Sequence, residues 1–245
     1  MKAKILINTL LDFIFPVHCL GCFSFMPSAS PTPYFCQSCL RNIKLVTHGQ
    51  CGFCSKLSHE GKTCPECQDS HELDFVWAAT RYEHSLIRKA LWAYKYKFIS
   101  SLWRALSELL LRFLKEHNKE QFFNTYREQL LVIPVPLHSY RLRWRSYNQS
   151  ELLAKAIAQQ FKLKLETKKL RRSKNRQPQI EIRDPQNRAE NATNIFICPK
   201  SKTLQNKTVI LVDDVSTTGS TLDSCAKVLK QAGVAKVIGL VVAKG

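Results

Sequence analysis

The sequence predicts an α/β protein in which a parallel sheet, covered by helices on both faces, follows a small cysteine-rich module. Two observations lead to this prediction. Eight of the ten cysteines lie between Cys19 and Cys67. From about Asp74 onward, short apolar runs typical of buried strands alternate with segments of helical periodicity. Strands that alternate with helices favour a parallel sheet between helical layers.

The predicted elements follow one another closely after residue 74. The apolar run 130–135 has no polar alternation, as expected of a buried parallel strand. We expect a helix cap near Asn148 or Ser150 and a helix end at Gly233. The predicted strands cover residues 75–81, 130–135, 163–167, 194–198, 209–212 and 237–242, and the predicted helices cover 85–96, 100–116, 149–161 and 220–231.

Composition and charge restrict the class of protein. Apolar residues make up 44% and charged residues 23% of the 245 residues, which excludes a disordered or collagen-like chain. Lys and Arg number 37 against 19 Asp and Glu, giving a formal charge of +18. This excess favours nucleic acid, phosphorylated small molecules or an anionic surface as partners.

The N-terminal segment and the cysteine usage indicate a cytoplasmic protein. No segment approaches the ~18 consecutive apolar residues of a membrane span. Asn8 and Asp12 interrupt the first apolar run, and no small-x-small cleavage site follows it. We expect an amphipathic helix over residues 3–15, with a poor signal peptide as the alternative. A reducing compartment favours metal binding by the cysteines over disulfides.

The eight clustered cysteines form four C-x-x-C pairs with the spacing of zinc knuckles. Two such knuckles place four thiolates around one Zn²⁺. We therefore predict structural zinc, with two sites favoured over one and sequential pairing as the simplest assignment, although a cross-braced pairing also fits. The module either docks on a partner or only stabilises the fold, and His18, His59 and His71 are expected to be surface residues. The predicted ligands are Cys19, Cys22, Cys36, Cys39, Cys51, Cys54, Cys64 and Cys67.

Residues 208–221, TVILVDDVSTTGST, combine an apolar strand, two carboxylates and a small-residue turn. Ligands of open α/β sheets bind beyond the carboxyl ends of the strands, and a helix N-terminus favours phosphate. Asp213 and Asp214 would accept hydrogen bonds from sugar hydroxyls beside that phosphate. The pattern predicts a ribose 5-phosphate site, with a solvated helix entry or an Mg²⁺ site as alternatives. The predicted phosphate contacts are Ser216, Thr217, Thr218, Gly219, Ser220 and Thr221.

A basic stretch interleaved with aromatic residues supports a second prediction. Residues 141–176 contain twelve Lys and Arg but only two acids, Glu151 and Glu166. Basic side chains follow a phosphate backbone and aromatic rings stack on unpaired bases, which indicates single-stranded DNA binding. A solvated basic face beside core aromatics is the alternative. The candidate contacts are Arg141, Arg143, Trp144, Arg145, Tyr147, Lys168, Lys169 and Arg171.

The string 208–221 resembles the phosphoribosyl-pyrophosphate (PRPP) motif of type I phosphoribosyltransferases. Together with the four knuckles, the chain resembles the ComF family of competence proteins and their gluconate-associated GntX relatives. Further markers are Leu91…Lys95, the Pro-Val-Pro-Leu-His run 134–138, Arg141…Arg145…Asn148-Gln149, and Arg188-x-x-Asn191 with Phe196. The family usually has glycine where this chain has Ser146, and commonly threonine where it has Arg176.

The resemblance implies a fold and a set of functions. It implies an N-terminal helix and double zinc ribbon over 1–73 and a type I phosphoribosyltransferase-like domain over 74–245. It implies that Mg²⁺ accompanies PRPP, that Leu137 and His138 lie in the pyrophosphate turn, and that Arg172 belongs to a hood over residues 171–193. Asp213, Asp214 and Arg172 would then carry catalysis, if the site turns over. The implied role is handling incoming single-stranded DNA with a competence helicase or recombination mediator; the alternatives are an active transferase or a non-catalytic PRPP-binding regulator.

Overall fold

A parallel sheet of five strands forms the centre of the protein, in the order β3-β9-β8-β4-β5. The computed structural model describes residues 16–27, 29–172 and 195–245. The strands are β3 (Phe75–Arg81), β4 (Leu130–Pro134), β5 (Lys164–Leu165), β8 (Thr208–Ser216) and β9 (Lys236–Lys244). Because all pairs are parallel, the carboxyl ends of the strands meet at one edge of the sheet.

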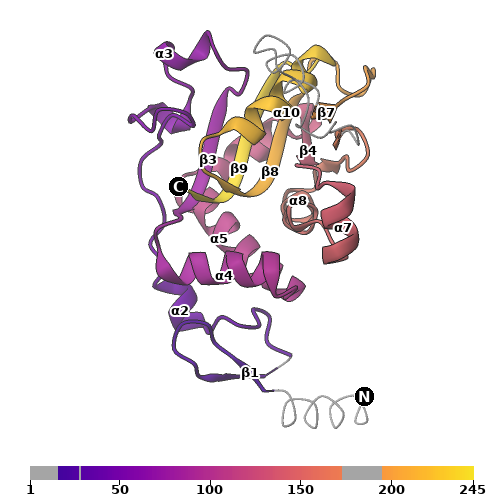
Figure 1. Ribbon diagram of the computed structural model, residues 1–245. Helices are drawn as coiled ribbons and strands as arrows, with labels where there is room; N and C mark the ends of the chain where they lie inside the picture. Colours follow the sequence, from indigo (N-terminus) through magenta and orange to yellow (C-terminus); the bar gives the residue numbers. More distant parts are fainter. Residues whose placement is uncertain (1–15, 28, 173–194) are drawn as a thin grey trace, which may run out of the picture.

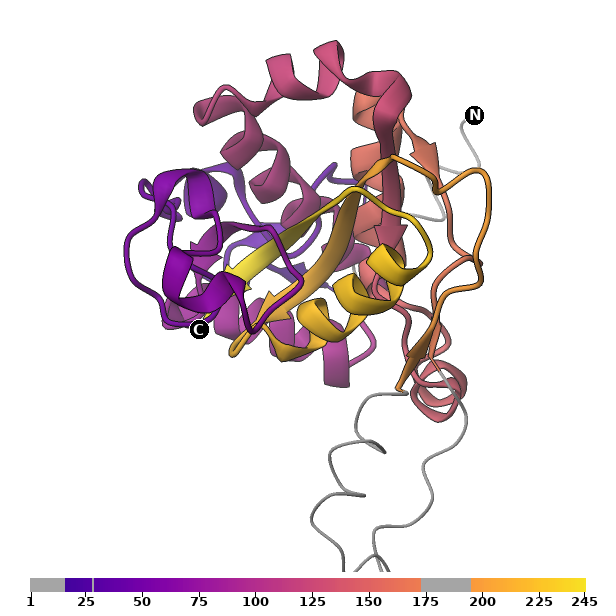
Figure 2. The same cartoon turned by 90° about the horizontal axis from the view of Figure 1, so that it is seen from above.

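Helices cover both faces of this sheet, as the sequence predicts (Figures 1 and 2). One face packs against α4 (Ser85–Tyr96), α5 (Trp103–Glu116), α6 (Lys119–Thr125) and α8 (Gln149–Phe161). The other packs against α10 (Ser220–Gln231). In β8, Ile210 and Val212 lie in the first core while Val209 and Leu211 lie in the second. A strand with a side-chain period of two thus fills two cores, which explains its unbroken apolar run.

The predicted helices over 85–96, 149–161 and 220–231 have the predicted bounds. Asn148 caps α8 by accepting a hydrogen bond from the Ser150 N–H at 3.2 Å. The helix predicted over 100–116 begins with a 3₁₀ turn, η2 (Ser100–Leu102), before α5. Helix α6, the 3₁₀ turn η3 (Arg127–Gln129) and the helix α7 (Ser139–Arg145) were not predicted, because none of them shows a clear apolar period.

Two strand predictions differ from the structure, one in its partner and one in its length. Of the predicted strand 194–198, residues 195–198 are described, and they contribute β7 (Phe196–Ile197), which pairs antiparallel with β6 (Arg171–Arg172) in a separate two-stranded sheet. The predicted strand 163–167 shortens to β5.

Within the described residues, no helix is long and apolar enough to cross a membrane.

The two parts of the cysteine-rich module contact different parts of the α/β domain. Its first part holds β1 (Val17–His18), β2 (Phe25–Met26) and α2 (Gln37–Arg41) and packs against α4, whereas the part with η1 (His59–Gly61) and α3 (Pro65–Gln68) lies beside β3 (Figure 1). Phe35, Leu40 and Ile43 are fully buried in the same core as α5. The Arg112 guanidinium of α5 donates to the Leu40 and Ile43 carbonyls. The module therefore shares the core of the larger domain.

Ser146, which stands where the resemblance predicts glycine, ends α7 in the left-handed conformation, with φ 64°. This conformation costs an L-residue energy that glycine avoids. The substitution therefore keeps the turn geometry at a local energetic cost.

Candidate functional site

The eight predicted zinc ligands form two clusters, each with its four sulfur atoms within 4.8 Å of one another. Tetrahedral zinc with Zn–S bonds of about 2.3 Å requires sulfurs about 3.8 Å apart, so the donor sets fit two Zn²⁺ ions. The structure confirms sequential pairing. The first cluster holds Cys19, Cys22, Cys36 and Cys39, and the second holds Cys51, Cys54, Cys64 and Cys67.

Backbone N–H groups point at the sulfurs of Cys19 and Cys51, the first ligand of each cluster, and lower the pKa of both thiols. The Cys19 Sγ accepts from the Gly21 and Cys36 N–H groups at 3.4 Å each. Burial raises the pKa of Cys51, but hydrogen bonds from the N–H groups of Cys64, Cys54 and Phe53 lower it by more. The net result is a pKa of about 6. Thiolates are the form that binds zinc, so the knuckle turns prepare Cys19 and Cys51 as ligands.

The STTGST turn (residues 216–221) joins the carboxyl end of β8 to the N-terminus of α10. Gly219 has φ 78°, and a side chain there would lie 3.0 Å from both the Gly52 carbonyl and the Phe53 ring. Thr217, Thr218, Ser220 and Thr221 are exposed, whereas the buried Ser216 Oγ has no hydrogen-bond partner among the described residues. The turn therefore presents hydroxyls and helix N–H groups outward, an arrangement suited to phosphate.

The second cysteine cluster is packed against this turn. Phe53, between Cys51 and Cys54, stacks on His71 with ring centroids 3.5 Å apart. The His71 imidazole contacts the Asp223 carboxylate of α10 at 3.0 Å, and the Leu73 N–H donates to the same carboxylate at 3.0 Å. His71, expected to be a surface residue, is instead half-buried in the interface that holds the start of α10.

Asp213 and Asp214 are held by different partners at the end of β8. The Ser150 hydroxyl donates to Asp213 Oδ1 at 2.7 Å. The Lys95 ammonium of α4 lies 3.0 Å from Asp214 Oδ1, while Asp214 Oδ2 is buried without a partner among the described residues. An unpaired buried carboxylate oxygen is unusual and is available to a ligand hydroxyl. Lys95 appeared in the sequence only as a family marker; its pairing with Asp214 came from the fold.

Burial raises the pKa of Asp213 to about 7, and the neighbouring charge of Asp214 acts in the same direction; the Ser150 hydroxyl and Lys95 oppose the shift. The folded chain therefore keeps a proton that the unfolded chain, with its ordinary aspartate pKa of 3.8, has already released. This difference couples the folding free energy to pH.

We expect the free energy of unfolding to fall by a few kcal/mol between about pH 4 and pH 7, because the folded state binds more protons there than the unfolded state. Asp213→Asn keeps an oxygen that accepts from Ser150 and removes the titration, so it should flatten this dependence and stabilise the protein at pH 8. Urea denaturation of both proteins at pH 5 and pH 8 measures the effect. The same pH slope in both proteins would contradict the assignment.

The predicted pyrophosphate turn lies at the same sheet edge. Pro134, the last residue of β4, pairs with Val212 of β8. Leu137 and His138 come soon after Pro134, and Asp213 comes directly after Val212, so both turns begin at the same edge of the sheet. Both residues are half-exposed, and His138 Nδ1 accepts from the Tyr140 N–H at 3.2 Å. The structure thus brings the two turns together at the carboxyl edge.

Arg172 lies on β6, with its guanidinium 5.5 Å from the centre of the Phe196 ring. Burial raises the pKa of the Cys225 thiol, Asp213 acts in the same direction, and Arg172 opposes the shift. Cys225 is fully buried, as expected of a small apolar residue. The rest of the predicted hood, including Lys174, Arg176, Arg183, Arg188 and Asn191, lies outside the described residues, as does the helix predicted over 3–15.

The predicted nucleic-acid residues are divided between the surface and the interior. Arg141, Arg143 and Trp144 of α7 are exposed. Arg145 is buried, and Tyr147 is half-buried with its hydroxyl donating to the Tyr94 carbonyl.

Lys168, Lys169 and Arg171 lie on the segment that leads into and begins β6. There the Lys169 ammonium donates to the Ser201 hydroxyl at 3.0 Å, and the Arg171 Nε donates to the Lys168 carbonyl at 2.9 Å. The predicted stretch therefore contributes basic groups from two separate segments.

Aromatic residues of α4 and its following loop extend the exposed part of α7. The Phe98 and Trp144 rings meet edge-on with centroids 4.8 Å apart, and the Arg145 guanidinium lies 5.8 Å from the centre of the Tyr96 ring. Trp92 and Tyr96 are four residues apart on α4 and lie outside its buried face. Their helical spacing off the apolar face is visible in the sequence and could have marked them as exposed. We call the following set the aromatic–basic surface: Trp92, Tyr96, Lys97, Phe98, Tyr140, Arg141, Arg143 and Trp144.

Two family models match the chain. Residues 10–68 match a double zinc ribbon domain and residues 148–245 match a phosphoribosyl transferase domain. Competence protein F of Haemophilus influenzae is 28% identical over 228 residues, which are 90% of this chain and 93% of that protein.

Two further relatives match a similar share of the chain. Competence protein ComFC of Bacillus subtilis is 24% identical and covers 84% of this chain and 81% of its own length. The DNA utilization protein YhgH of Escherichia coli O6:H1 is 26% identical over 84% of this chain and 94% of its own length. The chain is therefore a homologue of the ComF and ComFC competence proteins, with a double zinc ribbon and a phosphoribosyltransferase-like domain.

Proposed function

We propose that this protein is a cytoplasmic competence protein that binds single-stranded DNA on its aromatic–basic surface. The observation that carries the proposal is the exposure of large aromatic rings beside arginine and lysine. Trp92 and Trp144 are each 52% exposed and Tyr140 is 65% exposed. Rings of this size are costly to leave in water, and exposed rings that contact one another, as Trp92 does Tyr96 and Trp144 does Phe98, indicate a binding surface.

Single-stranded DNA fits this surface better than duplex DNA. Stacking of each unpaired base on an aromatic ring contributes about 1–3 kcal/mol, and duplex bases are not free to stack in this way. Arg141 and Arg143 lie on the same helix as Trp144 and supply charge for the phosphates between bases. A competence helicase or a recombination mediator stays the predicted protein partner.

Binding of a fluorescent oligothymidine, measured by anisotropy, tests the proposal. We expect Trp144→Ala and Trp92→Ala each to weaken binding by about 5- to 100-fold, the equivalent of one lost stack. Tyr126→Ala removes an aromatic ring that is 45% exposed outside this surface and should leave binding unchanged. Affinity should fall steeply with salt, with a smaller slope in Arg143→Ala. Equal binding of wild type and both tryptophan variants would overturn the proposal.

The STTGST turn supports a second proposed function, binding of PRPP together with Mg²⁺. The turn would hold the 5-phosphate, Asp213 and Asp214 the ribose hydroxyls, and Leu137 and His138 the pyrophosphate side. The unpaired Asp214 Oδ2 and Ser216 Oγ support this assignment, because a ligand would supply their missing hydrogen bonds. The site then belongs to an active transferase or to a non-catalytic PRPP-binding regulator.

Calorimetry with PRPP, with and without Mg²⁺, tests this second function. We expect binding by the wild type and at least about a tenfold loss in Asp213→Asn/Asp214→Asn, because charged groups that bond a ligand contribute about 1.5–3 kcal/mol each. Absence of binding at millimolar PRPP would contradict it. Release of pyrophosphate in the presence of candidate acceptors would identify a transferase, and PRPP binding without release across acceptors would identify a regulator.

A further inference from the structure

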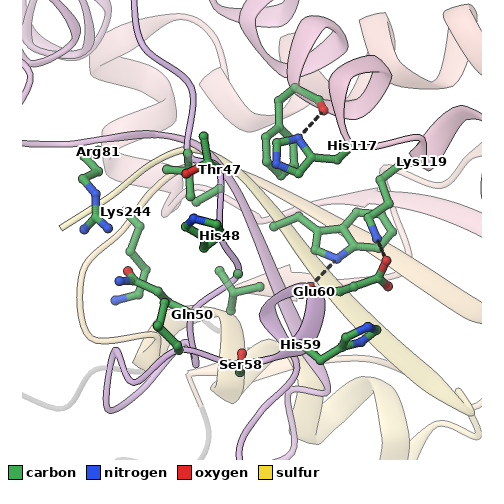
Figure 3. Close-up of a pocket in the computed structure, with 17 residues that line it drawn as sticks. Thr47, His48, Gln50, Ser58, His59, Glu60, Arg81, His117, Lys119 and Lys244 are labelled. Atoms are coloured by element: carbon green, nitrogen blue, oxygen red, sulfur yellow. Dashed lines mark hydrogen bonds and ion pairs between the residues drawn. The ribbon is translucent and has the colours of Figure 1, made fainter.

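A cavity lies beside the edge strand β3, and its lining does not include the carboxylates of β8 (Figure 3). Its volume is about 550 Å³, within the range of small-molecule sites. The segment 46–60, which leads from the first cysteine cluster into the second, forms one wall, and β3 with α5 and the start of α6 forms the other. Val46, Trp77 and Phe113 give the cavity a large apolar surface, a lining suited to the flat body of a small molecule.

Two cations lie side by side at one end of this cavity. Arg81 and Lys244 are register partners on the parallel strands β3 and β9, and both line the cavity (Figure 3). Burial lowers the pKa of Lys244, and Arg81 acts in the same direction, while Cys51 and Glu83 oppose it. The Lys244 ammonium donates to the carbonyls of Thr217 and Gly245, which leaves one of its three donors for a ligand.

The acidic group in the wall is already neutralised. The Glu60 carboxylate forms an ion pair with the Lys119 ammonium at 2.5 Å, and its backbone carbonyl accepts from the Trp77 indole N–H at 3.0 Å (Figure 3). The Ser58 hydroxyl oxygen in the same wall is buried and has no partner among the described residues. The cavity therefore offers two clustered cations, an unsatisfied hydroxyl and an apolar wall.

We propose that this cavity binds a small phosphorylated molecule with an aromatic body, of the size of a nucleoside monophosphate. The phosphate lies between Arg81 and Lys244, where a dianion relieves the repulsion of two adjacent cations. The aromatic body lies against Val46, Trp77 and Phe113, and His48 and Gln50 supply hydrogen bonds to its edge. This site is separate from the proposed PRPP site, although Lys244 contacts the turn of that site through the Thr217 carbonyl.

Calorimetry with adenosine monophosphate as the probe tests the proposal. We expect Arg81→Gln to weaken binding by at least about tenfold, because a charge-assisted hydrogen bond is lost. Arg81 is a better target than Lys244, whose replacement also changes the contact to Thr217. Arg88→Gln, on the exposed side of α4, is the matched control and should bind as the wild type does. Adenosine, which lacks the phosphate, should bind at least about tenfold more weakly than the monophosphate.

A second variant keeps all charges and closes the space. Ala78 lines the cavity and is only partly buried, so Ala78→Leu should reduce binding while circular dichroism shows an intact fold. Asp213→Asn/Asp214→Asn should leave binding of the monophosphate unchanged, since these carboxylates lie on β8. Absence of binding at millimolar concentration overturns the proposal. Binding that survives Arg81→Gln but is lost in the aspartate double variant also overturns it, because the nucleotide is then in the other site.

Discussion

Cys54→Ser is expected to remove one zinc ion and loosen the STTGST turn, whereas Cys22→Ser should remove one zinc ion and leave the turn intact. Each of these cysteines is the second cysteine of the first C-x-x-C pair in its cluster, and both are exposed, so the two variants are matched. They differ in what their clusters contact. The first cluster adjoins α4, and the second holds Phe53 against Gly219.

The physical reason is that zinc binding supplies much of the folding free energy of such a module. Structural zinc contributes about 10–16 kcal/mol to the folding of isolated zinc-finger peptides, and part of that stabilisation is transmitted through rigid contacts. Without the second ion, the Phe53–His71 stack and the His71–Asp223 contact lose their support. The start of α10 then opens more often.

Hydrogen exchange of residues 216–222 measures this opening, with zinc content determined in parallel. We expect at least about tenfold faster exchange in Cys54→Ser, the equivalent of about 1.4 kcal/mol of lost local stability. Cys22→Ser should match the wild type in this segment. Equal exchange in both variants would show that the second cluster does not hold the turn. This readout does not depend on whether the turn binds PRPP.

Lys95→Met is expected to destabilise the protein by about 3–5 kcal/mol, because it leaves the Asp214 carboxylate buried without its cation. The Asp214 side chain is only 7% exposed, and its second oxygen already has no partner among the described residues. Methionine preserves the length of the side chain, so the loss reports the charge rather than a cavity.

A double-mutant cycle in urea separates the charge from other effects. Asp214→Asn in the Lys95→Met background should restore a large part of the lost stability, because no unpaired charge remains. Lys155→Met breaks an exposed pair with Glu151 at 2.8 Å and should cost less than about 1 kcal/mol. A Lys95→Met variant as stable as Lys155→Met would contradict the buried-pair assignment.

Much of the fold was predictable because local patterns in this chain agree with the tertiary structure. The apolar run from Val209 to Val212 fills two cores, and the helices over 149–161 and 220–231 begin at recognisable caps or turns. The C-x-x-C spacing predicted two Cys₄ clusters in sequential order. The domain boundary predicted after residue 73 stays a prediction. Phe35, Leu40 and Ile43, which precede that boundary, lie in the core of the α/β domain.

The candidate sites were only partly predictable. Asp213, Asp214 and the turn are contiguous in sequence, and their pattern marked them. Lys95 reaches Asp214 across 119 positions of the chain, and no local pattern identifies such a pair. The contact of Phe53 with Gly219 likewise joins segments that are distant in sequence.

The sequence by itself determined the four cysteine knuckles, the parallel sheet and the position of the small-residue turn, because each depends on residue types at short spacing. The tertiary structure decided how the cysteines group into two clusters and which cluster lies against the turn, which aromatic residues remain exposed beside α7, and where two cations meet at the β3 edge. These features arise from contacts between distant segments, whose geometry is set by packing of the whole core rather than by local propensity.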